Sequence, residues 1–93
     1  MAQIIWTEPA LLDLNEIAEY IALDKPDPAR RLVKQVFSSV VHLEQFPESG
    51  RIPPELERSM YREVIVGSCR IVYRVDQDKV YIVYVMRGER QPR

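Results

Sequence analysis

The sequence is poor in the residues on which many small proteins depend for chemistry. Among 93 residues it has one cysteine, Cys69, and one histidine, His42. One residue of each kind cannot form an intramolecular disulfide, a Cys/His zinc site or a Ser-His-Asp triad. The three glycines lie far apart, which excludes a glycine-rich phosphate loop. We therefore expect no metal, no nucleotide cofactor and a cytoplasmic location.

Long hydrophobic runs are missing as well. No stretch approaches the roughly 18 apolar residues of a membrane span, and the first residues do not have the basic and apolar segments of a secretory signal. Hydrophobic residues make up 46% of the chain and charged residues 29%, a balance typical of a folded globular protein. We expect a single domain over residues 1–93 that makes no membrane contact.

Charge of one sign is missing from part of the chain. Residues 8–24 contain five acidic residues and no basic one, whereas residues 58–93 contain eight basic residues and four acidic ones. The net charge of −1 hides this asymmetry. The basic half is either a set of solvated surface charges or a face that meets an anionic partner.

The first half of the sequence predicts a short strand and two helices. Residues 4–6 are β-prone, and Thr7 can cap a helix that carries an apolar stripe to about residue 23. After a break at residues 24–28, Asp27 as N-cap and Pro28 at the first position predict a second helix to about Gln45. So short a link predicts an antiparallel helical hairpin.

The second half predicts a three-stranded meander over residues 61–66, 70–76 and 79–86. If both loops have two residues, at 67–68 and 77–78, alternation sorts the side chains onto two faces. The core face would then hold Val64, Val66, Ile71, Tyr73, Val75, Val80, Ile82, Tyr84 and Met86, with Arg62 at its margin. The other face would hold Tyr61, Glu63, Ile65, Arg70, Val72, Arg74, Asp76, Lys79, Tyr81, Val83, Val85 and Arg87. We expect its arginines to be exposed charges that contribute little to stability.

Several motifs occur in one order along the chain. They are Trp6-Thr7-x-x-Ala10-x-x-Asp13-Leu14-x-x-Ile17-x-x-Tyr20-Ile21, Phe46-Pro47-Glu48-Ser49-Gly50, Tyr61-Arg62-Glu63-Val64 and Arg70-Ile71-Val72-Tyr73-Arg74-Val75. Together they resemble the ParE branch of the RelE/ParE toxins of bacterial type II toxin–antitoxin systems. The resemblance implies an α+β fold, in which an N-terminal strand and a two-helix antiparallel hairpin pack on a C-terminal antiparallel sheet.

The family resemblance implies one of two activities. RelE-like members cut messenger RNA on the ribosome, whereas ParE-like members poison DNA gyrase and do not cut RNA. Arg70 and Arg90 match arginines that RelE-like enzymes use. Tyr61 and Glu63, however, occupy the positions of their two lysines, and the sequence ends at Arg93, before the position of their catalytic tyrosine.

RNA cleavage needs a base for the 2′-hydroxyl, an acid for the leaving oxygen and cations for the developing charge. If the chain were a ribonuclease, its candidates would be Arg70, Arg90 and Glu63, with Tyr81 as another proton carrier. Glu63 can equally be a cross-strand charge partner, and His42 lies on the second helix, away from the open sheet face. These departures favour a ParE-like gyrase inhibitor over a RelE-like ribonuclease. A degenerate binding module without toxicity is the third reading.

The resemblance also implies partners. Such toxins are bound by a cognate antitoxin, ParD-like or RelB-like, whose C-terminal segment folds on the toxin in a hetero-oligomeric complex. DNA gyrase is the expected target, and ribosome-bound messenger RNA is the alternative. We expect residues 88–93 to lie outside the core. The candidate target or antitoxin contacts are Tyr61, Arg70, Arg74, Tyr81, Arg87 and Arg90.

Overall fold

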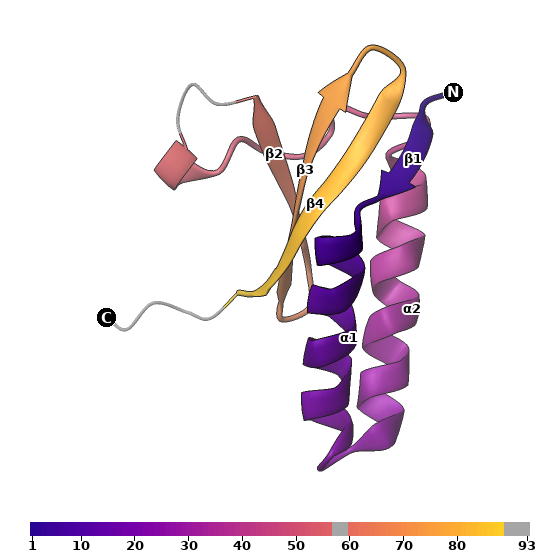
Figure 1. The fold of residues 1–93 in the computed structure, drawn as a ribbon, viewed down its shortest axis with the longest axis vertical. Coiled ribbons are helices and arrows are strands. Elements are labelled where there is room, and N and C mark those ends of the chain that lie inside the picture. The colour runs from indigo at the N-terminus through magenta and orange to yellow at the C-terminus, as the bar shows by residue number, and fades with distance from the viewer. Residues whose placement is uncertain (57–59, 89–93) are drawn as a thin grey trace.

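Two helices lie side by side against one face of a four-stranded sheet (Figure 1). The computed structural model describes residues 1–56 and 60–88. In chain order the elements are β1 (Gln3–Trp6), α1 (Glu8–Ala22), α2 (Pro26–His42), the short 3-10 helix η1 (Pro54–Leu56), β2 (Tyr61–Val66), β3 (Cys69–Asp76) and β4 (Lys79–Arg87). This architecture confirms the predicted α+β fold with its helical hairpin.

The first helix begins where the sequence predicts it and the second begins earlier. The Thr7 hydroxyl oxygen accepts a hydrogen bond from the Ala10 N–H at 3.3 Å and caps α1. The predicted N-cap of α2, Asp27, is wrong, because the helix starts at Pro26 after Lys25. Asp27 lies in the first turn and binds Arg30 three residues later. Within the described ranges, no helix is long and apolar enough to cross a membrane.

The sheet is mixed rather than purely antiparallel, with strand order β1-β4-β3-β2. The antiparallel meander of β2, β3 and β4 is as predicted. The N-terminal strand β1 joins it in parallel with β4, so that Ile4 lies opposite Val80 and Trp6 opposite Ile82. Parallel strands are joined by a long crossover connection, so the partner of β1 lies far away in the sequence. Local sequence patterns therefore do not predict this pairing.

Both predicted two-residue loops are present. Val66 pairs with Cys69 across the first loop, and Asp76 pairs with Lys79 across the second. Each loop begins with a residue of positive φ, Gly67 at 57° and Gln77 at 59°, as tight hairpin turns require. The register near these loops is therefore the expected one.

The expected register fails in the second half of β4. Tyr73 pairs with Ile82, but Val72, the residue before Tyr73 in β3, pairs with Tyr84. Val83 is therefore an extra residue that forms a β-bulge. Beyond the bulge the alternation reverses. Tyr84 and Met86 are 53% and 40% exposed, whereas Val85 is 3% exposed and belongs to the core. The predicted faces of residues 84–87 are thus inverted.

The core lies between the helical hairpin and the sheet. It is a single apolar cluster to which both helices and the three strands of the meander contribute. Trp6 of β1 packs at its margin against Phe37 of α2, with ring centroids 4.9 Å apart. The buried members are Ala10, Leu14, Ile17, Leu32, Val36, Val40, Leu43, Val66, Cys69, Ile71, Tyr73, Val80, Ile82 and Val85.

Candidate functional site

The sheet face that the helices leave uncovered, called the open face below, brings together four of the predicted contact residues. Tyr61, Arg74 and Tyr81 lie in one row across β2, β3 and β4. Arg70 lies on the same face four residues away from Arg74 along β3, beside Ile65 and Met86. The predicted mixture of arginine and aromatic residues therefore exists, although its membership differs near the end of β4.

The most constrained group on this face is an ion-pair network around Glu63. The Glu63 side chain is fully buried, and its two oxygens are held by two arginines. Arg51 Nε lies 2.6 Å from Oε2, while Arg70 Nη2 lies 2.7 Å from Oε1. A buried carboxylate is tolerated only when its charge is compensated in this way.

A second carboxylate completes the network. The carboxylate of Glu55, in η1, accepts hydrogen bonds from both terminal nitrogens of Arg70, from Nη1 at 3.1 Å and from Nη2 at 3.2 Å. This contact lowers the pKa of Glu55 below its ordinary value. The hydrogen bonds that Arg70 donates to Glu55 and Glu63 in turn raise the pKa of Arg70. The two arginines and two glutamates of the network balance one another in charge.

The position of Glu63 is also fixed through its backbone. Arg51 forms an isolated antiparallel bridge with Glu63, in which the two residues exchange N–H to carbonyl hydrogen bonds at 3.0 and 2.8 Å. The segment around Arg51 therefore covers part of the outer edge of β2. Sequence reasoning missed both Arg51 and Glu55, because they lie in a proline-rich connection where no periodicity marks a buried partner.

Arg74 has different surroundings. Its guanidinium lies over the ring of Tyr81, 4.4 Å from the centroid, in a cation–π contact. Asp76 is 3.8 Å away at the limit of an ion pair. The arginine is therefore less constrained than Arg70.

Arg87 does not lie on the open face, so the predicted position of this residue is wrong. Because of the bulge, Arg87 pairs with Cys69, a core residue, and its guanidinium lies over the ring of Tyr20 on α1 at 5.0 Å. Its role as a contact residue stays a prediction. Arg90, the remaining candidate, and most of the predicted tail lie outside the described residues.

A cavity of about 500 Å³ lies on the open face beside the Glu63 network. Arg70 and Glu55 line its polar end. The rest of its wall is mostly apolar and aromatic, a character typical of sites that take an apolar group with an oriented polar one. These further lining residues are Pro53, Tyr61, Val72, Tyr84 and Met86.

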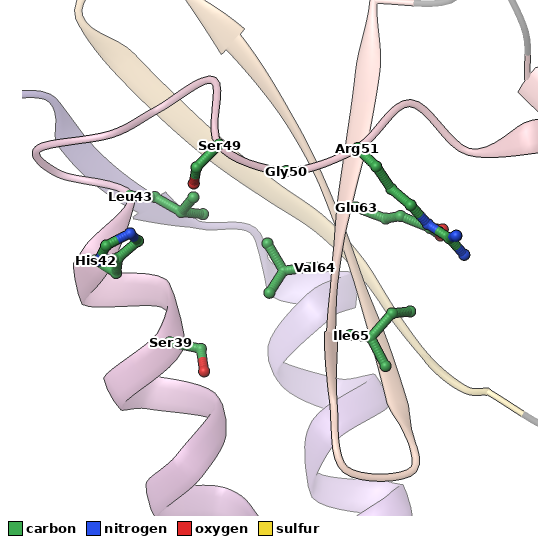
Figure 2. Close-up of a pocket in the computed structure, with 9 residues that line it drawn as sticks. All are labelled: Ser39, His42, Leu43, Ser49, Gly50, Arg51, Glu63, Val64 and Ile65. Atoms are coloured by element: carbon green, nitrogen blue, oxygen red, sulfur yellow. The ribbon is translucent and has the colours of Figure 1, made fainter.

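A second cavity, of about 360 Å³, lies between the end of α2 and β2. Figure 2 shows Val64 pointing toward α2, while the side chains of Arg51 and Glu63 point to the other side of β2. His42 lines this cavity and stacks on Phe46, away from the open face as predicted. The part of the chain that the structure describes holds no group of three or more His, Cys, Asp or Glu residues that could bind a metal ion.

Over residues 4–92 the sequence matches the family described as the ParE toxin of the type II toxin–antitoxin system parDE. The chain belongs to the ParE toxin family. One relative, Y4kP of Sinorhizobium fredii, is described as a candidate toxin and is 36% identical over 96% of this chain and 91% of its own length. Another, named toxin RelE2, comes from Caulobacter vibrioides and is 33% identical over 97% of this chain and 99% of its own length.

A solved structure agrees with this membership. A chain from the chromosomal ParDE toxin–antitoxin system of P. aeruginosa superposes with a TM-score of 0.79 at 26% sequence identity. The similarity covers 96% of this chain and 98% of the other. The fold of a ParE toxin is thus present over nearly the whole sequence.

Two motifs of this ParE-family chain have structural roles. The Phe46–Gly50 stretch is bound by Tyr73 of β3. The Tyr73 hydroxyl donates to the Pro47 carbonyl at 2.8 Å and accepts from the Gly50 N–H at 2.9 Å. Arg62 donates to the carbonyls of Glu48 and Gly50. These bonds hold the loop against β2 and β3 and so place Arg51 beside Glu63.

The N-terminal motif of the ParE-family chain ties α1 to β4. The Thr7 N–H and hydroxyl both donate to the Ile82 carbonyl, at 3.1 and 2.8 Å. Asp13, further along α1, accepts a hydrogen bond from the Val85 N–H at 3.1 Å. Both motif residues therefore hold the strand that carries the bulge.

Proposed function

We propose that this member of the ParE toxin family inhibits DNA gyrase and is neutralised by a ParD-like antitoxin in a hetero-oligomeric complex. The family match is to the toxin of a parDE system, and the solved relative from P. aeruginosa belongs to a ParDE system. The choice of gyrase over RNA depends on the chemistry of the open face.

The observation that carries this choice is the position of Arg70 between two carboxylates. Its guanidinium is engaged by Glu63 at 2.7 Å and by Glu55 at 3.1 and 3.2 Å. RNA cleavage needs a cation that is free to stabilise the negative charge on the phosphate in the transition state. A phosphate at Arg70 would have to displace Glu55 and would still lie close to the Glu63 carboxylate.

Proton transfer meets a similar obstacle. Glu63 is the carboxylate candidate for a general base, and a base must reach within about 3 Å of the proton that it removes. The Glu63 side chain is fully buried and both of its oxygens accept from arginines. Tyr81, the other candidate, lies in another row of the sheet under Arg74. This arrangement supports a binding surface rather than a ribonuclease site.

The open face also suits a proteinaceous partner. Its central charges are balanced within the network, and the cavity of about 500 Å³ beside them is lined mainly by apolar and aromatic side chains. Aromatic side chains are enriched where proteins bind one another, because they offer large contact areas at low entropic cost. Binding to the folded toxin would also stabilise this small domain by mass action.

The test compares the two targets with one preparation of protein. Purified toxin, released from its antitoxin and refolded, is added to gyrase with relaxed plasmid and, separately, to ribosomes translating a defined messenger RNA. We expect loss of supercoiling, relieved by equimolar antitoxin, and an intact messenger RNA. The toxin–antitoxin complex serves as the inactive control.

The ribonuclease is kept as a second candidate because the Caulobacter vibrioides relative bears the name toxin RelE2. Cleavage of the ribosome-bound messenger RNA with supercoiling unaffected would overturn the gyrase proposal in its favour. Inactivity in both assays, for a protein that still binds its antitoxin, would instead support a binding module without toxicity.

A further inference from the structure

The bulge in β4 decides which side chains of this strand reach the open face. Up to Ile82 the strand pairs with β3 in the register set by the turn at Gln77 and Asp78. Val83 is then skipped, and Val72 pairs with Tyr84. If Val83 were instead part of the regular ladder, with no bulge, plain alternation would turn Tyr84 and Met86 toward the helices and Val85 toward the open face.

Hydrogen bonds from the start of α1 bracket this extra residue. Before the bulge, the Ile82 carbonyl accepts from the N–H and the hydroxyl of Thr7. After it, the Val85 N–H donates to Asp13 at 3.1 Å. Both groups project from the edge of β4 that faces away from β3.

That edge loses its strand partner at the bulge. The pairing of β1 with β4 ends at Trp6 and Ile82, because the chain turns there into α1. The next outward N–H of β4 is that of Val85, and a backbone N–H at a partly buried position needs an acceptor. The Asp13 carboxylate supplies the acceptor that another strand residue would otherwise provide.

The consequence of this arrangement is the open-face cavity. Tyr84 and Met86, which are 53% and 40% exposed, form part of its wall, and Val85 is inserted into the core at 3% exposure. The unbulged register would bury a tyrosine and leave a valine at the cavity. The bulge therefore sets the chemistry of the surface that a partner meets.

We propose that Asp13 is a positioning residue: by accepting from the Val85 N–H it fixes the bulge at Val83, so that Tyr84 and Met86, and not Val85, line the open-face cavity. Contact between this cavity and a partner rests on the proposed function, whereas the placement of the side chains does not. The role of Asp13 in placing the side chains and the binding of a partner at the cavity can therefore be disproved independently.

Thiol labelling measures the placement directly. Met86→Cys and Val85→Cys are each made in the full-length chain, and the labelling rate at either position is followed by peptide mass spectrometry. Buried Cys69, whose pKa is raised by burial, reports unfolding in the same samples because it should stay unlabelled while the core is intact. We expect the thiol at position 86 to react at least about tenfold faster than the one at position 85.

Three substitutions, each made in both cysteine variants, distinguish the hydrogen-bond acceptor of Asp13 from its negative charge. Asp13→Ala should bring the ratio of the two rates close to one or invert it. Asp13→Asn, which keeps an acceptor oxygen, should preserve the ratio. Glu16→Ala, which removes an equal charge from an exposed position of α1, should preserve it as well. An unchanged ratio in Asp13→Ala with Cys69 protected would overturn the proposal.

Deletion of Val83 covers the case in which Asp13→Ala does not fold. Without the extra residue, plain alternation keeps Tyr84 and Met86 on the open face, so the bulge no longer needs to be held. Asp13→Ala combined with this deletion should fold and show the original labelling ratio. If the double variant is also unfolded, Asp13 serves another purpose and the proposal is wrong.

Discussion

The guanidinium of Arg70 lies 2.7 Å from the carboxylate of Glu63, and the Glu63 side chain is fully buried. Arg70 itself is only 23% exposed. A buried carboxylate loses its hydration on folding and depends on such partners for compensation. The charge at the centre of the open face is therefore part of the structure of the protein, and the expectation that Arg70 is an exposed charge is wrong. We accordingly predict a larger effect on stability than an exposed charge would have.

Arg70→Ala should lower the free energy of unfolding. Glu63 would keep Arg51 as a partner, but one of its buried oxygens would lose its donors, at a cost of about 2–3 kcal/mol. Denaturant unfolding of the purified variant measures the loss. Arg74→Ala is the matched control on the same strand, and it should cost about 1 kcal/mol or less, because its contacts are a cation–π pair and a distant aspartate. Equal losses in the two variants would contradict this account of Glu63.

Stability should respond to acid through Glu55. The hydrogen bonds from Arg70 lower the pKa of Glu55, so the folded state binds its proton less readily than the unfolded state does. Such a group stabilises the fold above its unfolded pKa, about 4.3, and this contribution is lost as the pH falls through the lower folded value. Glu55→Gln should therefore be less stable than the native chain at pH 7, and the gap should narrow as the pH is lowered below the unfolded pKa of Glu55. Unfolding midpoints measured across this range test the sign, and a gap that widens in acid would refute it.

Much of the fold could be predicted because its signals are local. Thr7 and the apolar stripe that follows predict α1 within a residue of its observed limits. The two-residue turns at residues 67–68 and 77–78 predict the pairing next to each loop. Such signals depend on neighbours along the chain, and the structure agrees with them.

The remaining errors come from interactions between distant residues. The bulge at Val83 is held by Asp13, 72 residues away from its partner Val85, so strand alternation alone cannot reveal it. The partners of Glu63 include Arg51 and Glu55, which belong to a connection without regular periodicity. The candidate site was therefore predicted in composition but not in its contacts.

Gly50→Ala should weaken the fold strongly for a loop substitution. A Cβ atom at this position would lie 2.6 Å from the Tyr73 hydroxyl oxygen and 2.7 Å from the Glu63 carbonyl oxygen. Because the Tyr73 hydroxyl is held by Pro47 and Gly50, relief of this overlap must shift the loop or the sheet, at about 1–3 kcal/mol. Ser49→Ala, at the exposed neighbouring position, is the control and should change stability by less than about 0.5 kcal/mol. Thermal and denaturant unfolding distinguish the two, and a fully stable Gly50→Ala would show that the loop can move freely.

Truncation after Gly88 should separate toxicity from folding. The Gly88 N–H donates to the Ser68 carbonyl at 2.5 Å, so the shortened chain keeps this contact beyond the end of β4. The removed residues 89–93 include Arg90 and Arg93, which belong to the basic half of the sequence and favour contact with an acidic surface or a phosphate backbone. We expect the truncated protein to bind antitoxin and to lose growth inhibition and gyrase inhibition. A full-length variant with both arginines changed to glutamine controls for chain length, and it should behave like the truncation if charge is the cause. Undiminished growth arrest by the truncated protein would instead move the toxic surface away from the tail, toward the acidic face of α1.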